Sequence, residues 1–269
     1  MCTSIRILGK PFWPGVVFVE FHARLPIKEK EPLNRTREKL PTLPHILIFD
    51  VDGVLVDVRR SYWLSAIETM RYLTGKRVTW SELHNWKSKA GNNDDWRLVS
   101  NWATALGRPT TYEQARVAFE QFYWGRNGKP GNVRKEKFVV TARQIEQWAR
   151  RFELNLFTGR TREEFSHTFD TWPATQRFRT IITMDDVKRK KPHPDGLLKI
   201  LGYRDPATAL YVGDNIDDAL AARDARVPFV AILPPGAHEH RKHAARFREL
   251  GALALLPRVV ALNGWLRSR

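Results

Sequence analysis

Short, continuous apolar runs recur from residue 46 onward, and segments with helical periodicity separate them. Runs of this length are typical of strands that are buried on both faces of a parallel sheet. The predicted strands are 46–49, 154–157, 180–183, 209–212 and 229–232. Helices are expected at 141–151, 161–171, 194–202, 216–225 and 238–250. Because strand and helix alternate, the sequence predicts an α/β fold, a doubly wound parallel sheet with helices on both faces.

The segment 59–137 breaks this alternation. Its apolar residues follow a helical period with no convincing strand, and helices are predicted at 60–73, 80–90, 94–106 and 111–123. We therefore expect an all-helical cap domain, inserted into a catalytic core made of 45–58 and 138–269. Open α/β sheets bind ligands at the carboxyl ends of their strands. Because the cap leaves the core just after the first strand, it is expected to cover the binding site.

Residues 1–44 have the composition of an extension. Prolines interrupt any long helix or central strand there, at positions 11, 14, 26, 32, 41 and 44. The apolar stretch 16–21 could form an edge strand or a clasp. A misassigned start codon or a flexible, disordered arm is at least as good an interpretation.

The amino-acid composition limits the cellular compartments and the binding partners that we expect for this protein. A lone cysteine, Cys2, excludes an internal disulfide and suits a reducing cytoplasm, which is the location we expect. No apolar run is long enough to span a membrane, and no secretory signal is evident. The formal net charge of +16 favours polyanionic partners. No nucleic-acid-binding motif accompanies that charge, so nucleic acid is an open but not a favoured partner. The oligomeric state stays open.

Residues that could take part in chemistry or ligand binding follow four of the predicted strands. They are Asp50 and Asp52 after the first, Thr158 and Gly159 after the second, Lys191 after the third, and Asp214 and Asp218 after the fourth. The ends of parallel strands lie side by side, so these residues should converge in one crevice. Two carboxylates about 4 Å apart repel by roughly 4 kcal/mol at an effective dielectric near 20. The cluster therefore needs a cation, and Mg²⁺ commonly pairs one or two carboxylates with a substrate phosphate.

This set of side chains suits the hydrolysis of a phosphate ester. As a nucleophile, Asp50 would divide one displacement into two through an aspartyl-phosphate. Asp52 could protonate the leaving oxygen and then deprotonate water. The Thr158 hydroxyl and the Lys191 ammonium would bind phosphoryl oxygens. The sequence thus predicts a Mg²⁺-dependent phosphatase that acts on a small phosphorylated metabolite.

The four motifs, in this order, resemble the haloacid dehalogenase superfamily, subfamily I with a helical cap, in its phosphatase branch. The resemblance covers about 45–240 and rests on D-x-D-G-V at 50–54, the strand-ending Thr158, Lys191 before Pro192, and Gly213-Asp214 with Asp218. It implies the roles given above for Asp50, Asp52, Thr158 and Lys191. It also implies that Asp50, the Asp52 carbonyl and Asp214 hold Mg²⁺, and that Asp218 binds a metal water or braces Lys191.

Several residues have a second interpretation. In the cap, the polar segment 91–97 is the predicted substrate contact, through Asn93 and Arg97, although a helix cap made by Asn93 or Asp94 is an equal alternative. Thr158 could instead cap the helix at 161–171. Asp217 could take the place of Asp218 in the fourth motif, although the spacing to Asp214 favours Asp218. The remaining open positions are Arg160 and Arg162, at the substrate or on the surface, and His193, which is expected to be an exposed loop residue.

Other functions compete with the phosphatase. Haloacid dehalogenation is disfavoured by Asp52, because that chemistry lacks an acid–base Asp two residues after the nucleophile. A phosphomutase would share Asp50 and Asp52. A nucleic-acid end phosphatase would account for both the charge and the site, and a steep salt dependence of binding would distinguish it. A non-catalytic phosphate-binding protein is the remaining alternative, and it would be expected to have lost one of the four motifs.

Overall fold

The computed structural model describes residues 43–89, 91–235 and 240–268. The predictions for Cys2 and for the stretch 16–21 lie outside these residues, as does nearly all of the extension 1–44. The described core contains a six-stranded parallel sheet with strand order β10-β9-β8-β1-β6-β7. Its strands are β1 (Ile46–Phe49), β6 (Glu153–Phe157), β7 (Phe178–Ile182), β8 (Ala209–Gly213), β9 (Phe229–Ile232) and β10 (Ala254–Leu256). All five predicted strands are confirmed, and β10 is an addition.

Helices cover both faces of this sheet, as the fold class required. Leu47 and Phe49 point into a core shared with α5 (Ala142–Ala149), α6 (Arg162–Phe169) and α10 (Leu262–Arg267). Ile46 and Ile48 point into a second core, shared with α7 (Asp195–Leu201), α8 (Ile216–Ala225) and α9 (His240–Glu249). Successive side chains of a strand alternate between its faces. Both faces of β1 are buried, and its four residues are all apolar.

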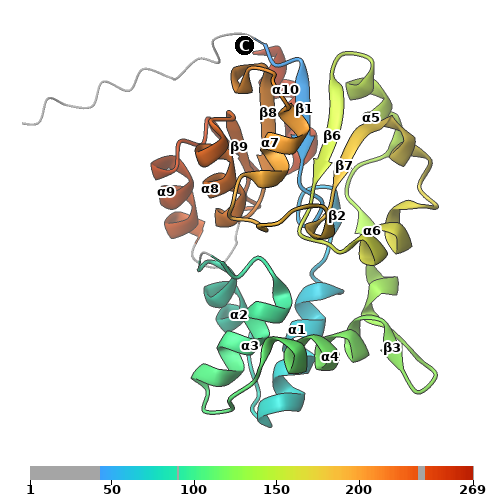
Figure 1. The fold of residues 1–269 in the computed structure, drawn as a ribbon, viewed down its shortest axis with the longest axis vertical. Coiled ribbons are helices and arrows are strands. Elements are labelled where there is room, and N and C mark those ends of the chain that lie inside the picture. The colour runs from blue at the N-terminus through green and yellow to red at the C-terminus, as the bar shows by residue number, and fades with distance from the viewer. Residues whose placement is uncertain (1–42, 90, 236–239, 269) are drawn as a thin grey trace, which may run out of the picture. The chain divides into compact units, whose positions relative to one another are not determined.

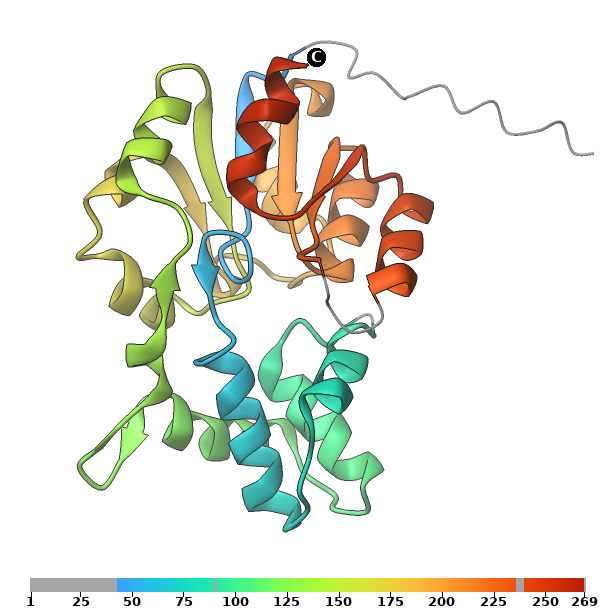
Figure 2. The same cartoon turned by 180° about the vertical axis from the view of Figure 1, so that it is seen from behind.

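Four helices make up most of the cap, near the predicted positions. They are α1 (Tyr62–Thr74), α2 (Trp80–Lys87), α3 (Asp95–Ala105) and α4 (Tyr112–Tyr123). Figures 1 and 2 show them on the side of the sheet to which the strands point. The cap is not purely helical, because a short hairpin of β3 (Gly125–Arg126) and β4 (Lys129–Pro130) follows α4. Two-residue strands carry too short a pattern to be recognised in a sequence.

The two connections between cap and core pair with each other. β2 (Val56–Asp57) and β5 (Lys137–Phe138) form an antiparallel ladder in which Val56 lies opposite Phe138. The chain therefore leaves the core and returns to it at one place, directly after Asp52. The short 3-10 helices are η1 (Asn132–Lys135), η2 (Pro173–Arg177), η3 (Met184–Asp186), η4 (Pro206–Thr208) and η5 (Val259–Ala261). No described helix combines the length and apolarity that a membrane span requires.

Candidate active site

The turn after β1 brings two parts of the site into direct contact. Asp50 is the first residue beyond the strand and is buried. Gly53 has a positive φ of 76°, and a Cβ at this position would lie 1.8 Å from Oδ2 of Asp214. Only glycine permits both the left-handed backbone and this approach. The glycine of the D-x-D-G motif thus lets the first and fourth strand ends meet.

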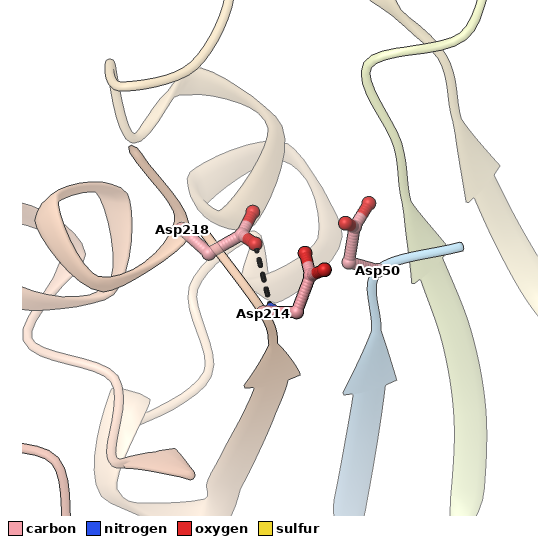
Figure 3. Close-up of side chains that lie close together, drawn as sticks. All are labelled: Asp50, Asp214 and Asp218. Carbon is pink, nitrogen blue, oxygen red and sulfur yellow. Dashed lines mark hydrogen bonds between the residues drawn. The ribbon is translucent and has the colours of Figure 1, made fainter. Parts of the chain in front are cut away.

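A buried lysine lies among the carboxylates. Nζ of Lys191 is 2.8 Å from Oδ1 of Asp50 and 2.7 Å from Oδ1 of Asp218, and its side chain is 2% exposed. Ligand oxygens of Asp50, Asp214 and Asp218 all lie within 4.8 Å of one another (Figure 3). The structure therefore brings together four of the predicted residues. One ammonium faces three carboxyl groups.

Burial and neighbouring negative charges raise the proton affinity of Asp50 and Asp214. Burial raises the pKa of Asp50 against the opposing charge of Lys191, and together with the charges of Asp218 and Asp52 it brings this pKa to about 7. Burial, followed by the charges of Asp50 and Asp218, raises the pKa of Asp214 well above its usual value. These oxygens lack a positive charge that a hard divalent cation would supply. The donor set, carboxylate oxygens only, fits Mg²⁺.

The two acidic residues at the start of α8 point in different directions. Oδ1 of Asp218 accepts hydrogen bonds from Lys191 and from the Tyr211 hydroxyl, and Oδ2 accepts from the amides of Asp214 and Asn215. With both oxygens engaged, bracing Lys191 is the role that fits Asp218. Asp217 instead accepts hydrogen bonds from the cap amides of Gly91, at 2.9 Å, and Asn93, at 3.2 Å. Asp218, not Asp217, joins the cluster.

The end of β6 supplies Thr158 and an arginine. Thr158 is buried, and its hydroxyl accepts the amide N–H of Arg160 at 3.1 Å. The N-cap of α6 is Thr161, so the helix-cap interpretation of Thr158 is wrong. Arg160 was expected on the surface or at the substrate. It is fully buried and bonds Oδ1 of Asp52 through Nη2, at 2.7 Å, and Nε, at 3.0 Å.

A cavity of about 940 Å³ lies between the strand ends and the cap. Asp50, Asp52, Gly159 and Asp214 line it from the core. Thr158, Lys191 and Asp218 are buried in the core and are not among the lining residues. His193 is exposed, as expected, and so is Arg162.

The cap segment 91–97 meets the predictions only in part. Asn93 lines the cavity, and its Nδ2 would lie 3.2 Å from a Cβ at Gly159. Arg97 is exposed, does not line the cavity, and packs over the Tyr112 ring at 5.6 Å. The reason is that Asp94 caps α3 by accepting the amides of Trp96 and Arg97, which turns Arg97 outward. The prediction that Arg97 contacts substrate is therefore not supported.

The cap instead brings an ion pair to the cavity, which the sequence pattern did not reveal. Nζ of Lys87 lies 2.8 Å from Oδ1 of Asp95, and these side chains are 14% and 13% exposed. Both residues line the cavity. Burial opposes the charge of Lys87, but Asp95, Asp214 and Asp52 raise its pKa. Lys87 is thus a cation held above the core carboxylates.

Known proteins share this architecture. The model of the haloacid dehalogenase-like hydrolases matches residues 142–232. The chain is 29% identical over 198 residues to an imidazoleglycerol-phosphate dehydratase of Phytophthora nicotianae, covering 70% of this chain but only 43% of that protein. It is 28% identical over 197 residues to a phosphoglycolate phosphatase of Pseudomonas fluorescens, covering 71% and 70% of the two chains.

A solved structure agrees in fold. It is a hydrolase of this superfamily, subfamily IA, from Geobacter sulfurreducens, with a TM-score of 0.54 and 22% identity, covering 83% of this chain and 97% of that one. The segment matched by the family model contains Thr158, Lys191 and Asp214, and the remaining motif stands at the end of β1. The chain is thus similar to the haloacid dehalogenase-like hydrolases over residues 142–232, and it shares its fold with a solved hydrolase of that superfamily.

Proposed function

We propose that this chain is a Mg²⁺-dependent phosphatase that hydrolyses a small phosphorylated metabolite through an aspartyl-phosphate on Asp50. The arrangement of Asp50 carries the proposal: a carboxylate at the end of the central strand, 2.8 Å from Lys191 and facing Asp214 across the cavity floor. Relatives named phosphoglycolate phosphatase support the reaction class. The lone cysteine supports a cytoplasmic location.

The side chains divide the reaction into two steps. A carboxylate oxygen of Asp50 attacks phosphorus, and Asp52 gives a proton to the departing ester oxygen. Asp52 then takes a proton from the water that cleaves the aspartyl-phosphate. Lys191 and the hydroxyl of Thr158 stabilise charge on the phosphoryl oxygens. A bound Mg²⁺, held by Asp50, Asp214 and the Asp52 carbonyl, would neutralise the carboxylates and polarise the phosphoryl group.

Product analysis on a panel of phosphorylated metabolites tests this function. The purified protein with Mg²⁺ should release inorganic phosphate from at least one of them. A phosphomutase would return an isomer of the substrate without net phosphate release. If neither product appears on any substrate, a non-catalytic phosphate-binding role replaces the proposal.

Removal of metal is expected to stop turnover completely. Without a divalent cation, burial raises the pKa of Asp50 to about 7, so a large fraction of Asp50 is protonated at neutral pH, and a protonated carboxyl is a poor nucleophile. The phosphoryl group also lacks the charge that the cation would supply. Dialysis against chelator should abolish phosphate release, and added Mg²⁺ should restore it. Ca²⁺ should support little turnover, because it prefers more ligands and looser geometry.

Metal binding should also displace protons. Calorimetric titration with Mg²⁺ near pH 6.5, in two buffers of different ionisation enthalpy, should show net proton release from the wild type. Asp214→Asn, which removes the negative charge of a metal ligand, is the matched variant and should bind Mg²⁺ weakly. Full activity after rigorous metal removal would contradict this part of the proposal.

The cap should select the substrate through Lys87 and Asn93, not through Arg97. Lys87→Met should lower kcat/KM for the natural substrate by roughly tenfold or more, because a charge-assisted hydrogen bond contributes about 1.5–3 kcal/mol. Arg97→Met is the matched control on the exposed side of α3 and should keep wild-type kcat/KM. Equal losses in the two variants would mean that they act through folding of the cap.

A further inference from the structure

Arg160 is a buried residue with several charged and polar partners. Its side chain is 0% exposed. Two of its nitrogens bond one oxygen of Asp52, and a third, Nη1, bonds Oε2 of Glu136 at 3.0 Å and the hydroxyl of Thr168 at 2.8 Å. The guanidinium thus connects the acid–base residue to a second carboxylate. That carboxylate, Glu136, is also buried, with 4% of its side chain exposed.

The far end of this connection belongs to the cap. Glu136 lies between η1 and β5, in the segment that returns to the core. Its Oε1 accepts a hydrogen bond from the hydroxyl of Tyr123, the last residue of α4, at 3.0 Å. Tyr62, the first residue of α1, packs its ring 5.2 Å from the Arg160 guanidinium. Both ends of the cap therefore meet the group that holds Asp52.

We propose that Arg160 is a positioning residue for Asp52, and that Glu136 fixes Arg160 against the cap so that Asp52 is aimed at the leaving oxygen. This inference rests on the proposed phosphatase function. A planar guanidinium with several donors suits this task, because it bonds Asp52 and Glu136 at once in a fixed geometry. A lysine offers one ammonium at the end of a flexible stem and cannot reproduce that arrangement.

Hydrolysis of the aspartyl-phosphate needs Asp52 with every substrate, whereas formation of the aspartyl-phosphate needs it only when the leaving oxygen is strongly basic. When the P–O bond of an alkyl ester breaks, the oxygen leaves as a strongly basic alkoxide unless Asp52 transfers a proton to it. When the leaving group is a dinitrophenolate, the oxygen departs with its electron pair and needs no proton. Misplacing Asp52 should therefore slow attack on an alkyl phosphate and spare attack on dinitrophenyl phosphate.

The test compares kcat and KM of both substrates in four proteins. Arg160→Lys keeps the buried positive charge and loses the paired hydrogen bonds from Nε and Nη2 to Asp52. Glu136→Gln loosens the far end without touching the cavity, of which Glu136 is not a lining residue. Arg162→Lys, two residues away and 47% exposed, is the matched control. Melting temperature and circular dichroism establish that each variant is folded.

In Arg160→Lys, kcat for the alkyl phosphate should fall roughly tenfold to a hundredfold, since a positioned general acid contributes about 10²–10⁴-fold. Formation of the aspartyl-phosphate from dinitrophenyl phosphate, seen as a dinitrophenolate burst, should keep its rate within about threefold, and KM should change little. Glu136→Gln should also slow the alkyl phosphate more than dinitrophenyl phosphate, but with a smaller loss of kcat. Arg162→Lys should leave the rates of both substrates unchanged.

Each other outcome overturns the inference in its own way. Equal losses in the rate of aspartyl-phosphate formation from both substrates would assign Arg160 to folding or to the common chemistry, with the phosphatase function intact. Unchanged kinetics in Arg160→Lys would mean that the contact with Asp52 has no catalytic consequence. A wild-type protein that hydrolyses neither ester would overturn the proposed function, and this inference with it.

Discussion

Replacing Asp50 by asparagine is expected to abolish turnover while the fold stays intact. Asparagine has nearly the same shape but cannot form an aspartyl-phosphate, so phosphate release should drop by roughly 10⁴-fold or more. The measurement is phosphate release from an aryl phosphate with saturating Mg²⁺. Retention of more than a few per cent of the activity would identify another nucleophile.

The same variant should also show how much the ionised Asp50 carboxylate destabilises the metal-free protein. The pKa of Asp50 is about 7 in the folded protein against 3.8 for the free group. Between these values the unfolded chain releases the proton first, so the wild type loses stability as pH rises from about 4 to about 7. Relative to the wild type, Asp50→Asn should therefore gain on the order of 2 kcal/mol of stability between pH 5 and pH 8.

Urea denaturation of metal-free wild type and Asp50→Asn at both pH values measures this gain. Asp195→Asn is a suitable control, because Asp195 forms an ion pair with Arg189 far along the chain from β1 and has its pKa lowered, mainly by the hydrogen bond from Arg189. A stability difference between wild type and Asp50→Asn that is the same at pH 5 and pH 8 would show that the carboxyl titrates normally.

Replacing Lys191 by methionine should be the most destabilising single change in the site. It would leave the buried carboxylates of Asp50 and Asp218 without their cation, and breaking a buried pair in this way costs about 3–5 kcal/mol. Activity should also disappear, because the phosphoryl group loses a charged ligand. Urea denaturation of the metal-free protein measures the loss of stability.

Mg²⁺ should restore part of the stability of Lys191→Met, because it also supplies positive charge to these carboxylates. Lys188→Met tests the surrounding basic run: Lys188 is exposed, and its replacement should change stability by less than about 0.5 kcal/mol. Comparable losses in the two variants would indicate that the whole run, and not the ion pairs of Lys191, stabilises the protein.

The sequence predicts those parts of the structure that follow from the pattern of apolar residues along the chain. Strands such as β1 and β8 are apolar at every position because helices cover both of their faces, so their ends could be located in advance. Once the strand ends are located, parallel pairing alone brings Asp50 next to Asp214. Lys191 could be separated from the other basic residues of its run by Pro192, which follows it and fits the third motif of the resemblance.

Contacts that depend on tertiary packing could not be predicted in this way. Arg160 and Lys87 look like ordinary solvated charges in a sequence, since nothing along the chain records the buried carboxylates that they meet. A helix cap decides the direction of Arg97 within a single turn of α3. The strand-ending Thr158 followed by Arg160 was the one available signal for the Asp52 partner.

The position of β1 has a consequence for biosynthesis. β1 is made early, yet both of its neighbours come late, because Ile46 pairs with Glu153 on one side and with Ala209 on the other. As the chain leaves the ribosome, the cap helices have their partners nearby and can form early, whereas the apolar strand β1 stays unpaired. Long-range parallel pairing is slow and leaves apolar surface exposed to aggregation. Because β8 supplies the second neighbour of β1 and leads into Asp214 and Asp218, a nascent chain that stops before β8 is expected to present a folded cap, a β1 with one unpaired edge and an incomplete carboxylate cluster.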